Sequence, residues 1–210
     1  DAELLLARVL GCDRIRLVVD SERPLDGSEL SAYRALHKRR RLGEPVAYLL
    51  GERAFFGRDF FVDERVLVPR PETEHVVEVA LRRTRPLSLC CRVLDLCTGS
   101  GCVAVTLKKE RPTTTVFASD VSVDALWVAQ RNCTRHTAVV GLVRSDLFDR
   151  LDHLRGRLDL ITANPPYIDP ASMAELPRDV RAYEPTLALE GTGEDGLDFI
   201  RRMVTEAPQM

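Results

Sequence analysis

The second half of the chain alternates short apolar runs with amphipathic segments, and this pattern restricts the fold more than any other feature. Runs typical of buried strands lie at 92–96, 114–120, 138–143 and 158–163. Segments with helical periodicity lie at 71–83, 102–110, 122–133 and 197–210. This alternation predicts an α/β fold with a mainly parallel sheet. Four strands are few for a doubly wound domain, so we expect the last strands of the sheet to be missing from this sequence.

The first seventy residues have a different pattern. Residues 1–42 are predicted to be helical, with a polar turn at 24–27 and Gly43 as a stop. Residues 45–69 carry Gly-bearing turns and predict a β-hairpin. Most of its aromatic side chains are expected to pack onto a neighbouring domain; they are Tyr48, Phe55, Phe56, Phe60 and Phe61. The basic run 38–41 is interpreted as a solvated helix C-terminus rather than an RNA contact.

Composition excludes several classes of protein. The 210 residues contain 30 basic and 32 acidic side chains, for a net charge of −2, whereas proteins that wrap nucleic acid usually carry a basic excess. No apolar run reaches about 18 residues, so no membrane span is expected. The six cysteines form no CxxC pair and the four histidines are scattered, which indicates no metal and a reducing, cytoplasmic location. Adjacent Cys90 and Cys91 are interpreted as core residues.

The segment VLDLCTGSGC, residues 93–102, predicts a cofactor site. A buried strand ends at Asp95, and the turn that leads into a helix contains Thr98, Gly99, Ser100 and Gly101. Its glycines let the backbone approach a ligand, and the helix N-terminus offers free N–H groups. Asp120 ends the next strand, 19 residues after Gly101, where an acidic side chain accepts hydrogen bonds from ribose hydroxyls.

S-adenosylmethionine fits this turn better than a nucleotide with phosphates does. No lysine follows Gly101 as in a phosphate cradle, and the turn lacks the GxGxxG pattern of dinucleotide sites. Asp95 would repel a pyrophosphate but suits a cationic ligand. The letters GTGEDG at 191–196 do match GxGxxG, but acidic residues crowd that segment, so it is interpreted as a loop that leads into the acidic first turn of a helix.

The sequence Asn164-Pro165-Pro166-Tyr167 follows a predicted strand directly. In open α/β sheets, ligands bind at the carboxyl ends of the strands. The prolines stiffen the backbone, so the Asn164 side chain and the Pro165 carbonyl are expected to accept hydrogen bonds from a planar –NH2 group that Tyr167 covers.

These motifs together resemble a known family. NPPY after the DLCTGSG turn is similar to amino-methyltransferases that use S-adenosylmethionine. A more specific resemblance is to the HemK/PrmC-type protein-(glutamine-N5) methyltransferases, which act on peptide chain release factors. It is carried by four segments: 39–74 (with VPRPETE), 95–102, 164–168 and 180–199. The resemblance implies a class I, Rossmann-like methyltransferase domain at 71–210, a β-hairpin linker at 45–70 and a helical substrate-recognition domain at 1–44. Both end domains are expected to be incomplete relative to the family.

The resemblance also implies roles for individual residues. Cys97 to Gly101 would form the cofactor turn, Asp120 would hold the ribose, and Asp146 and Leu147 would border the adenine. Asn164 would lie between cofactor and substrate, and residues 164–167 would hold the substrate glutamine. Cys97 stands where the commoner turn has Gly; its side chain could crowd the methionine moiety or force an unfavourable φ, but because Cys is small, we expect the turn to tolerate it.

Three functions remain open at this stage. Methylation of the glutamine N5 in the Gly-Gly-Gln motif of release factors, by a monomer that binds neither membrane nor nucleic acid, fits the motifs best. A nucleic-acid methyltransferase acting on adenine N6 or guanine N2 would have the same NPPY edge. A non-catalytic protein that retains the pocket as a scaffold is the third.

Overall fold

A four-stranded parallel sheet forms the centre of the larger part of the molecule. The computed structural model describes residues 1–87 and 90–210. The strand order is β5-β4-β3-β6, and all pairs are parallel, as predicted. The strands are β3 (Arg92–Leu96), β4 (Thr115–Asp120), β5 (Val140–Arg144) and β6 (Leu160–Ala163). Because parallel strands all end at one edge, the segments after them meet there.

Both faces of the sheet are buried, and strand β3 shows how. Val93 belongs to a cluster with residues of α5 (Glu74–Thr84) and α6 (Cys102–Glu110). Leu94 points the other way, into a cluster with Leu151 and residues of the C-terminal helix α9 (Asp198–Glu206). This alternation follows from the two-residue period of a strand. Helix α7 (Val123–Arg135) packs against β4 and β5.

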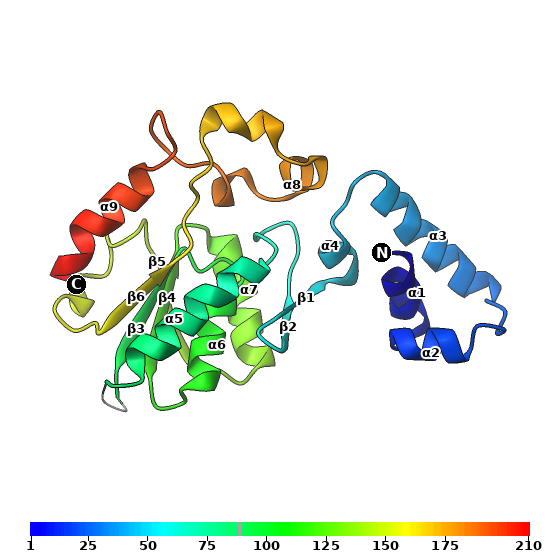
Figure 1. The fold of residues 1–210 in the computed structure, drawn as a ribbon, viewed down its shortest axis with the longest axis horizontal. Coiled ribbons are helices and arrows are strands. Elements are labelled where there is room, and N and C mark those ends of the chain that lie inside the picture. The colour runs from blue at the N-terminus through cyan, green and yellow to red at the C-terminus, as the bar shows by residue number, and fades with distance from the viewer. Residues whose placement is uncertain (88–89) are drawn as a thin grey trace.

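The N-terminal helices form a separate group at one end of the molecule (Figure 1). They are α1 (Ala2–Leu10), α2 (Arg14–Val19) and α3 (Gly27–Arg41). Asp26 caps α3 with a reciprocal capping box to Glu29, and the basic run occupies its last turn, as predicted. The sequence prediction missed α2 as a separate helix. Its signal was Asp13, whose side chain accepts a hydrogen bond from Arg16 N at 2.8 Å.

The segment 45–69 is a hairpin only in part. Residues 46–50 form helix α4 (Val46–Leu50), so the prediction of strand structure there was wrong; Gly51, with φ 71°, ends this helix. The hairpin consists of β1 (Glu52–Phe55) and β2 (Arg58–Phe61), with Gly57 in the turn at φ 71°. The Phe55 and Phe60 rings are fully buried against α5 and α6, which confirms the predicted packing role.

Other predictions hold with smaller corrections. The helix predicted from Pro71 starts as a 3-10 turn (Pro71–Thr73) before α5, and the predicted last helix ends at Glu206 with a second 3-10 turn. Helix α8 (Arg178–Tyr183) lies between β6 and α9 in sequence. Cys91 is buried, but Cys90 is exposed, so its interpretation as a core residue was wrong. Among the described residues, no helix is both long and apolar enough to span a bilayer.

Candidate functional site

A deep cleft opens at the carboxyl ends of the four parallel strands. It encloses about 1090 Å³ of space, its open mouth included. Nine of the ten predicted cofactor-binding residues line it: Asp95, Cys97, Thr98, Gly99, Ser100, Asp120, Asp146, Leu147 and Asn164. We call it the cofactor cleft. It lies where ligands bind in open α/β sheets.

The turn between β3 and α6 forms the floor of this cleft. Three of its residues have left-handed backbones: Cys97 at φ 53°, Gly99 at φ 54° and Gly101 at φ 78°. Two hydrogen bonds hold the turn, from Thr98 N to Ser119 O (3.0 Å) and from Gly101 N to Thr98 O (2.8 Å). The unfavourable φ considered for Cys97 is therefore present, because a side chain is disfavoured in this region and glycine is not.

Asp95 is a buried carboxylate under the turn, with 2% of its surface exposed. Its Oδ2 accepts a hydrogen bond from Thr98 Oγ1 (2.6 Å) and its Oδ1 accepts one from Thr162 Oγ1 (2.8 Å). Burial raises the pKa of Asp95 to about 6, and the two threonine hydroxyls counteract that rise. At neutral pH the group is an anion in a low-dielectric site, which favours a cationic ligand nearby.

Asp120 lies at the end of β4 and faces the same cleft. Its Oδ2 accepts a hydrogen bond from Gly99 N (2.9 Å), and its Oδ1 accepts one from Ser122 N (2.9 Å). Burial raises the pKa of this carboxyl. Since each carboxylate oxygen has two acceptor sites, one on each remains for the hydroxyls of a ribose.

Three predicted cofactor residues have structural features of their own. Gly101 does not line the cleft; it starts α6, and a Cβ there would lie 3.1 Å from the Cβ of Ala129 on α7. Leu147 is buried and has φ 43°, a second strained position at the cleft. Asp146 lines the cleft while its Oδ1 pairs with Arg202 at 3.2 Å.

A second cleft lies beside the first, and we call it the substrate cleft. All four residues of the NPPY segment line it. Asn164 and Pro166 line both clefts, whereas Pro165 and Tyr167 line the substrate cleft only. Tyr167 is 56% exposed, so its ring is available at the mouth. The predicted substrate residues are therefore together, with Asn164 on the boundary between the two spaces.

The segment 186–196 supports the NPPY edge from behind. Ile168 N donates to Leu189 O (3.0 Å), and Gly191 N donates to Ile168 O (2.9 Å). A Cβ on Gly196 would lie 2.9 Å from Tyr167 O, so the loop needs glycine there to approach the edge. The GTGEDG letters thus belong to a loop that leads into α9, whose first turn carries Asp198, as predicted.

Sequence reasoning missed several residues of the walls. Arg70 and Thr73 line both clefts, and Leu189 lines the substrate cleft. Glu184 is buried behind Arg70 and binds it at 2.6 Å. The available signal was an arginine between two prolines, Pro69 and Pro71, within a segment used only for the family resemblance.

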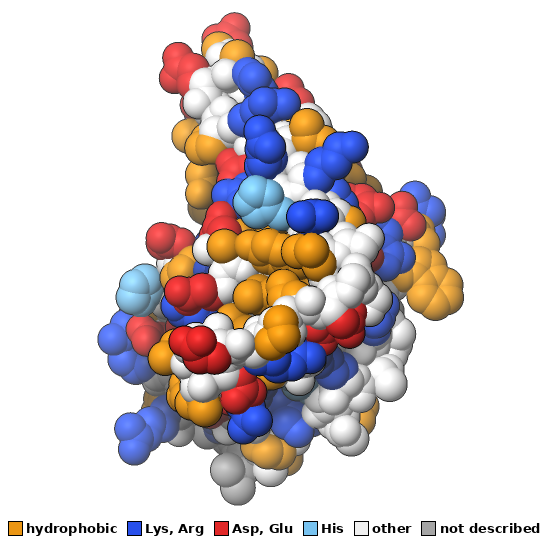
Figure 2. All heavy atoms as spheres, turned by 90° about the vertical axis from the view of Figure 1, so that its right-hand side faces the viewer, with side chains coloured by type: hydrophobic (Ala, Val, Ile, Leu, Met, Phe, Trp, Pro, Cys, Tyr) orange, Lys and Arg blue, Asp and Glu red, His pale blue; other side chains and the backbone are white. Residues whose placement is uncertain are grey.

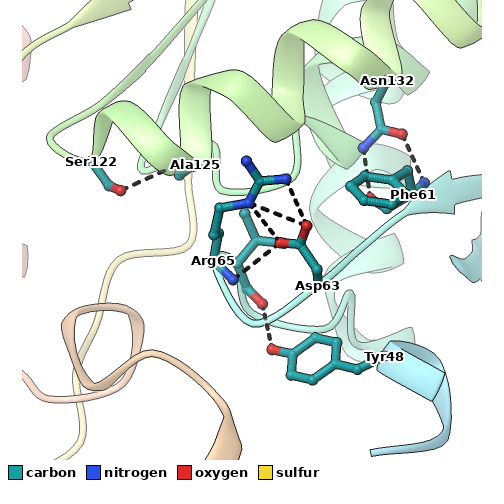
Figure 3. Close-up of polar contacts among 8 residues, drawn as sticks. Tyr48, Phe61, Asp63, Arg65, Ser122, Ala125 and Asn132 are labelled. Atoms are coloured by element: carbon teal, nitrogen blue, oxygen red, sulfur yellow. Dashed lines mark hydrogen bonds and ion pairs between the residues drawn. The ribbon is translucent and has the colours of Figure 1, made fainter. Parts of the chain in front are cut away.

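Polar contacts of Asn132 connect the hairpin to the cofactor turn. Asn132 of α7 is fully buried; its Nδ2 donates to Phe61 O (2.9 Å), and its Oδ1 accepts from Phe61 N (2.8 Å) (Figure 3). Its Nδ2 also donates to Ser100 O (2.8 Å) in the cofactor turn. On the other side, Tyr48 Oη donates to Val66 O (2.6 Å). The Asn132 bonds hold the hairpin against the cofactor turn, and the Tyr48 bond joins two parts of the linker.

The residues present fit S-adenosylmethionine. A carboxylate with free acceptor sites lies at the end of β4, which suits a ribose, and a buried anion lies under the turn, which suits a cationic ligand. No atom lies within 4 Å of a Cβ built on Gly99, so the backbone there borders open space. Asp95, Asp120 and the turn 97–100 would hold the group.

Comparison with known proteins decides the family. Residues 1–51 match the model of the PrmC N-terminal domain, and residues 80–176 match that of the methyltransferase small domain. The release factor glutamine methyltransferases of Geobacter sulfurreducens and Chlorobaculum tepidum are 46% and 45% identical to this chain over its whole length. The chain covers 72% and 73% of those two proteins. It belongs to the release factor glutamine methyltransferase family.

Membership in this family accounts for the fold and the donor. The chain has the class I methyltransferase fold, and S-adenosylmethionine is its methyl donor. The human METTL16 catalytic domain, crystallised with an RNA hairpin, superposes with a TM-score of 0.60 at 18% identity. That match covers 78% of this chain and 60% of the other, and it shows a shared fold only.

Proposed function

We propose that this chain transfers a methyl group to the side-chain amide nitrogen (N5) of the glutamine in the Gly-Gly-Gln motif of a peptide chain release factor. The observation that carries the proposal is the position of Asn164, which lines both clefts. A group held by Asn164 in the substrate cleft lies next to the cofactor cleft. The relatives named release factor glutamine methyltransferase support the choice of substrate.

The chain's main contribution to the reaction is alignment. S-adenosylmethionine supplies an activated methyl group on a cationic sulfur. A glutamine amide nitrogen is a weak nucleophile because its lone pair is delocalised into the carbonyl. Orientation of reacting groups lowers such barriers by about 7–11 kcal/mol. Pro165 and Pro166 provide the stiff edge for that orientation, since each ring fixes its own φ.

Asn164 and Pro165 also favour the transition state electrostatically. The Asn164 Oδ1 and the Pro165 carbonyl would accept hydrogen bonds from the –NH2 group. These bonds strengthen as positive charge develops on nitrogen, so they raise the rate rather than the affinity alone. The nitrogen gains a carbon and loses a proton, which leaves to solvent, so this proposal needs no dedicated base.

Charge distribution favours a protein substrate over bare nucleic acid. The net charge is −2. On the face that carries the N-terminal helices, basic side chains gather over α3, and below them basic, acidic and apolar side chains are mixed (Figure 2). We likewise propose a cytoplasmic monomer with three regions, 1–44, 45–70 and 71–210.

The test is methyl transfer from labelled S-adenosylmethionine to a purified release factor. A factor with its Gly-Gly-Gln glutamine changed to alanine is the matched control, and DNA and RNA serve as parallel acceptors. We expect label in the unmodified factor alone. Label in nucleic acid, or equal label in both factors, contradicts the proposal.

A further inference from the structure

An ion pair lies behind the wall that the two clefts share. Arg70 lines both clefts, and its Nη2 donates to Glu184 Oε1 at 2.6 Å. The other carboxylate oxygen of Glu184 accepts a hydrogen bond from Val68 N at 3.1 Å. The Glu184 side chain is 2% exposed and the Arg70 side chain 37%, so the acid is behind the wall and the base reaches the clefts.

The surroundings fix this pair in place. Glu184 follows α8, and the neighbouring Tyr183 Oη donates to Leu42 O at 3.3 Å, at the end of the N-terminal helices. Arg70 stands between two prolines, which restrict its backbone. A buried carboxylate is tolerated when it is paired and hydrogen-bonded, and Glu184 meets both conditions. The pair therefore presents a fixed guanidinium whose charge is balanced.

A glutamine amide needs more than the acceptors of the NPPY edge. Its –NH2 group finds Asn164 and Pro165, but its carbonyl oxygen needs a donor once it leaves water. A guanidinium has five N–H donors, and Glu184 Oε1 uses one Nη2–H of Arg70. Arg70 also lines the same two clefts as Asn164.

We propose that Arg70 donates a hydrogen bond to the carbonyl oxygen of the substrate amide, and that Glu184 is a positioning residue that holds Arg70 and balances its charge. This inference rests on the proposed function. The balance of charge matters because the amide nitrogen becomes positive during methyl transfer. A net cation beside it opposes that change, whereas a neutral pair orients the amide without this penalty.

Three variants separate orientation from charge. Glu184→Gln retains an oxygen for Val68 N but leaves Arg70 as a net cation, so we expect kcat to fall about tenfold with little change in KM. Arg70→Lys keeps the charge but loses the planar fork, so KM for the factor rises about tenfold. The double variant Arg70→Met/Glu184→Gln removes both charges. Its kcat is therefore expected to exceed that of Glu184→Gln, while its KM stays high.

Arg58 and Glu110 provide a matched control. This pair also lies at 2.6 Å, with side chains 25% and 33% exposed, and neither residue lines a cleft. Glu110→Gln is expected to leave kcat and KM unchanged. Thermal unfolding of every variant shows whether it folds. If the double variant does not fold, Arg70→Lys still tests the inference.

Binding provides a readout that does not depend on turnover. Calorimetry with S-adenosylhomocysteine present compares the release factor with a Gly-Gly-Gln factor changed to Gly-Gly-Leu, which lacks the carbonyl oxygen. Arg70→Lys is expected to weaken binding of the first factor and not of the second. Equal weakening of both, or a double variant whose kcat is lower than that of Glu184→Gln, overturns the inference. If the unmodified enzyme labels no factor, the proposed function itself falls.

Discussion

The cofactor cleft and the substrate cleft are neighbours, but they are built differently. The floor of the cofactor cleft is a continuous turn, residues 97–100, completed by the ends of adjacent strands. The wall of the substrate cleft comes from three segments distant in sequence, within 67–76, 164–168 and 176–189. A local turn follows from local residue preferences, whereas an assembled wall depends on tertiary contacts. Substitutions in the two clefts should therefore fail in different ways.

The largest expected effect is loss of methyl transfer without loss of cofactor binding. Asn164→Ala removes an acceptor for the –NH2 group and should lower kcat about 10²–10³-fold, by analogy with the loss of one group that stabilises transition-state charge. Affinity for S-adenosylhomocysteine, measured by calorimetry, should change little because the turn 97–100 is intact. Asn164→Asp retains an acceptor oxygen and should keep more activity than the alanine variant. Full turnover by Asn164→Ala would remove this residue from the mechanism.

A pH effect should come from the cofactor side. The pKa of Asp95 is about 6 in the fold, above its ordinary value of 3.8. The folded state therefore holds this proton more tightly, and stability falls as pH rises from about 4 to about 6, by about 3 kcal/mol in total. Denaturant unfolding at a series of pH values measures this slope. Asp95→Asn should flatten that part of the profile, and an unchanged slope assigns it to another group.

Two glycines of the same turn separate steric from backbone effects. Gly101→Ala combines φ 78° with a Cβ 3.1 Å from Ala129, and should destabilise the fold by about 2 kcal/mol. Gly99→Ala has a similar φ but no atom within 4 Å of its Cβ, so about 1 kcal/mol is expected. Denaturant unfolding compares them. Equal losses in the free energy of unfolding would mean that backbone strain alone accounts for the effect of both substitutions.

The smallest expected effect is an increase in the stability of the fold. Cys97→Gly relieves a left-handed φ of 53° and should stabilise the fold by about 0.5 kcal/mol, after the entropy that glycine loses on folding is subtracted. Cys97→Ala keeps the strain and should show no such gain. Both variants are measured by thermal unfolding at one protein concentration. A gain in the alanine variant instead would point to crowding by the sulfur.

The sequence allowed prediction of the parts whose chemistry is local. The strand-turn-helix at 92–110 and the Asn-Pro-Pro-Tyr edge were visible because Gly allows backbone conformations that other residues avoid and Pro fixes its own φ. Asp120 was found from its place at the end of the next strand. The family resemblance added the substrate, which the residues alone left open.

The parts that escaped prediction depend on partners far along the chain. Arg70 and Glu184 are 114 residues apart, and no local pattern indicates that they pair. Helix α4 was assigned to the hairpin because Tyr48 and Gly51 belong to the pattern of aromatic residues and Gly-bearing turns in this segment, whereas Tyr48 packs and hydrogen-bonds with the linker as part of a helix. Tertiary contacts therefore decided the structure at both places.

The bond between Phe61 and Asn132 has a consequence for synthesis on the ribosome. The two residues are 71 positions apart, so at about 5–20 residues per second the hairpin precedes its anchor by roughly 4–14 s. Helix α6, which later helps to bury the rings of Phe55 and Phe60, ends at Glu110, 50 residues after Phe60, so these rings lack that part of the core for roughly 2.5–10 s of the interval. The nascent hairpin therefore exposes aromatic side chains transiently, and a chaperone that binds aromatic segments has several seconds in which to bind it.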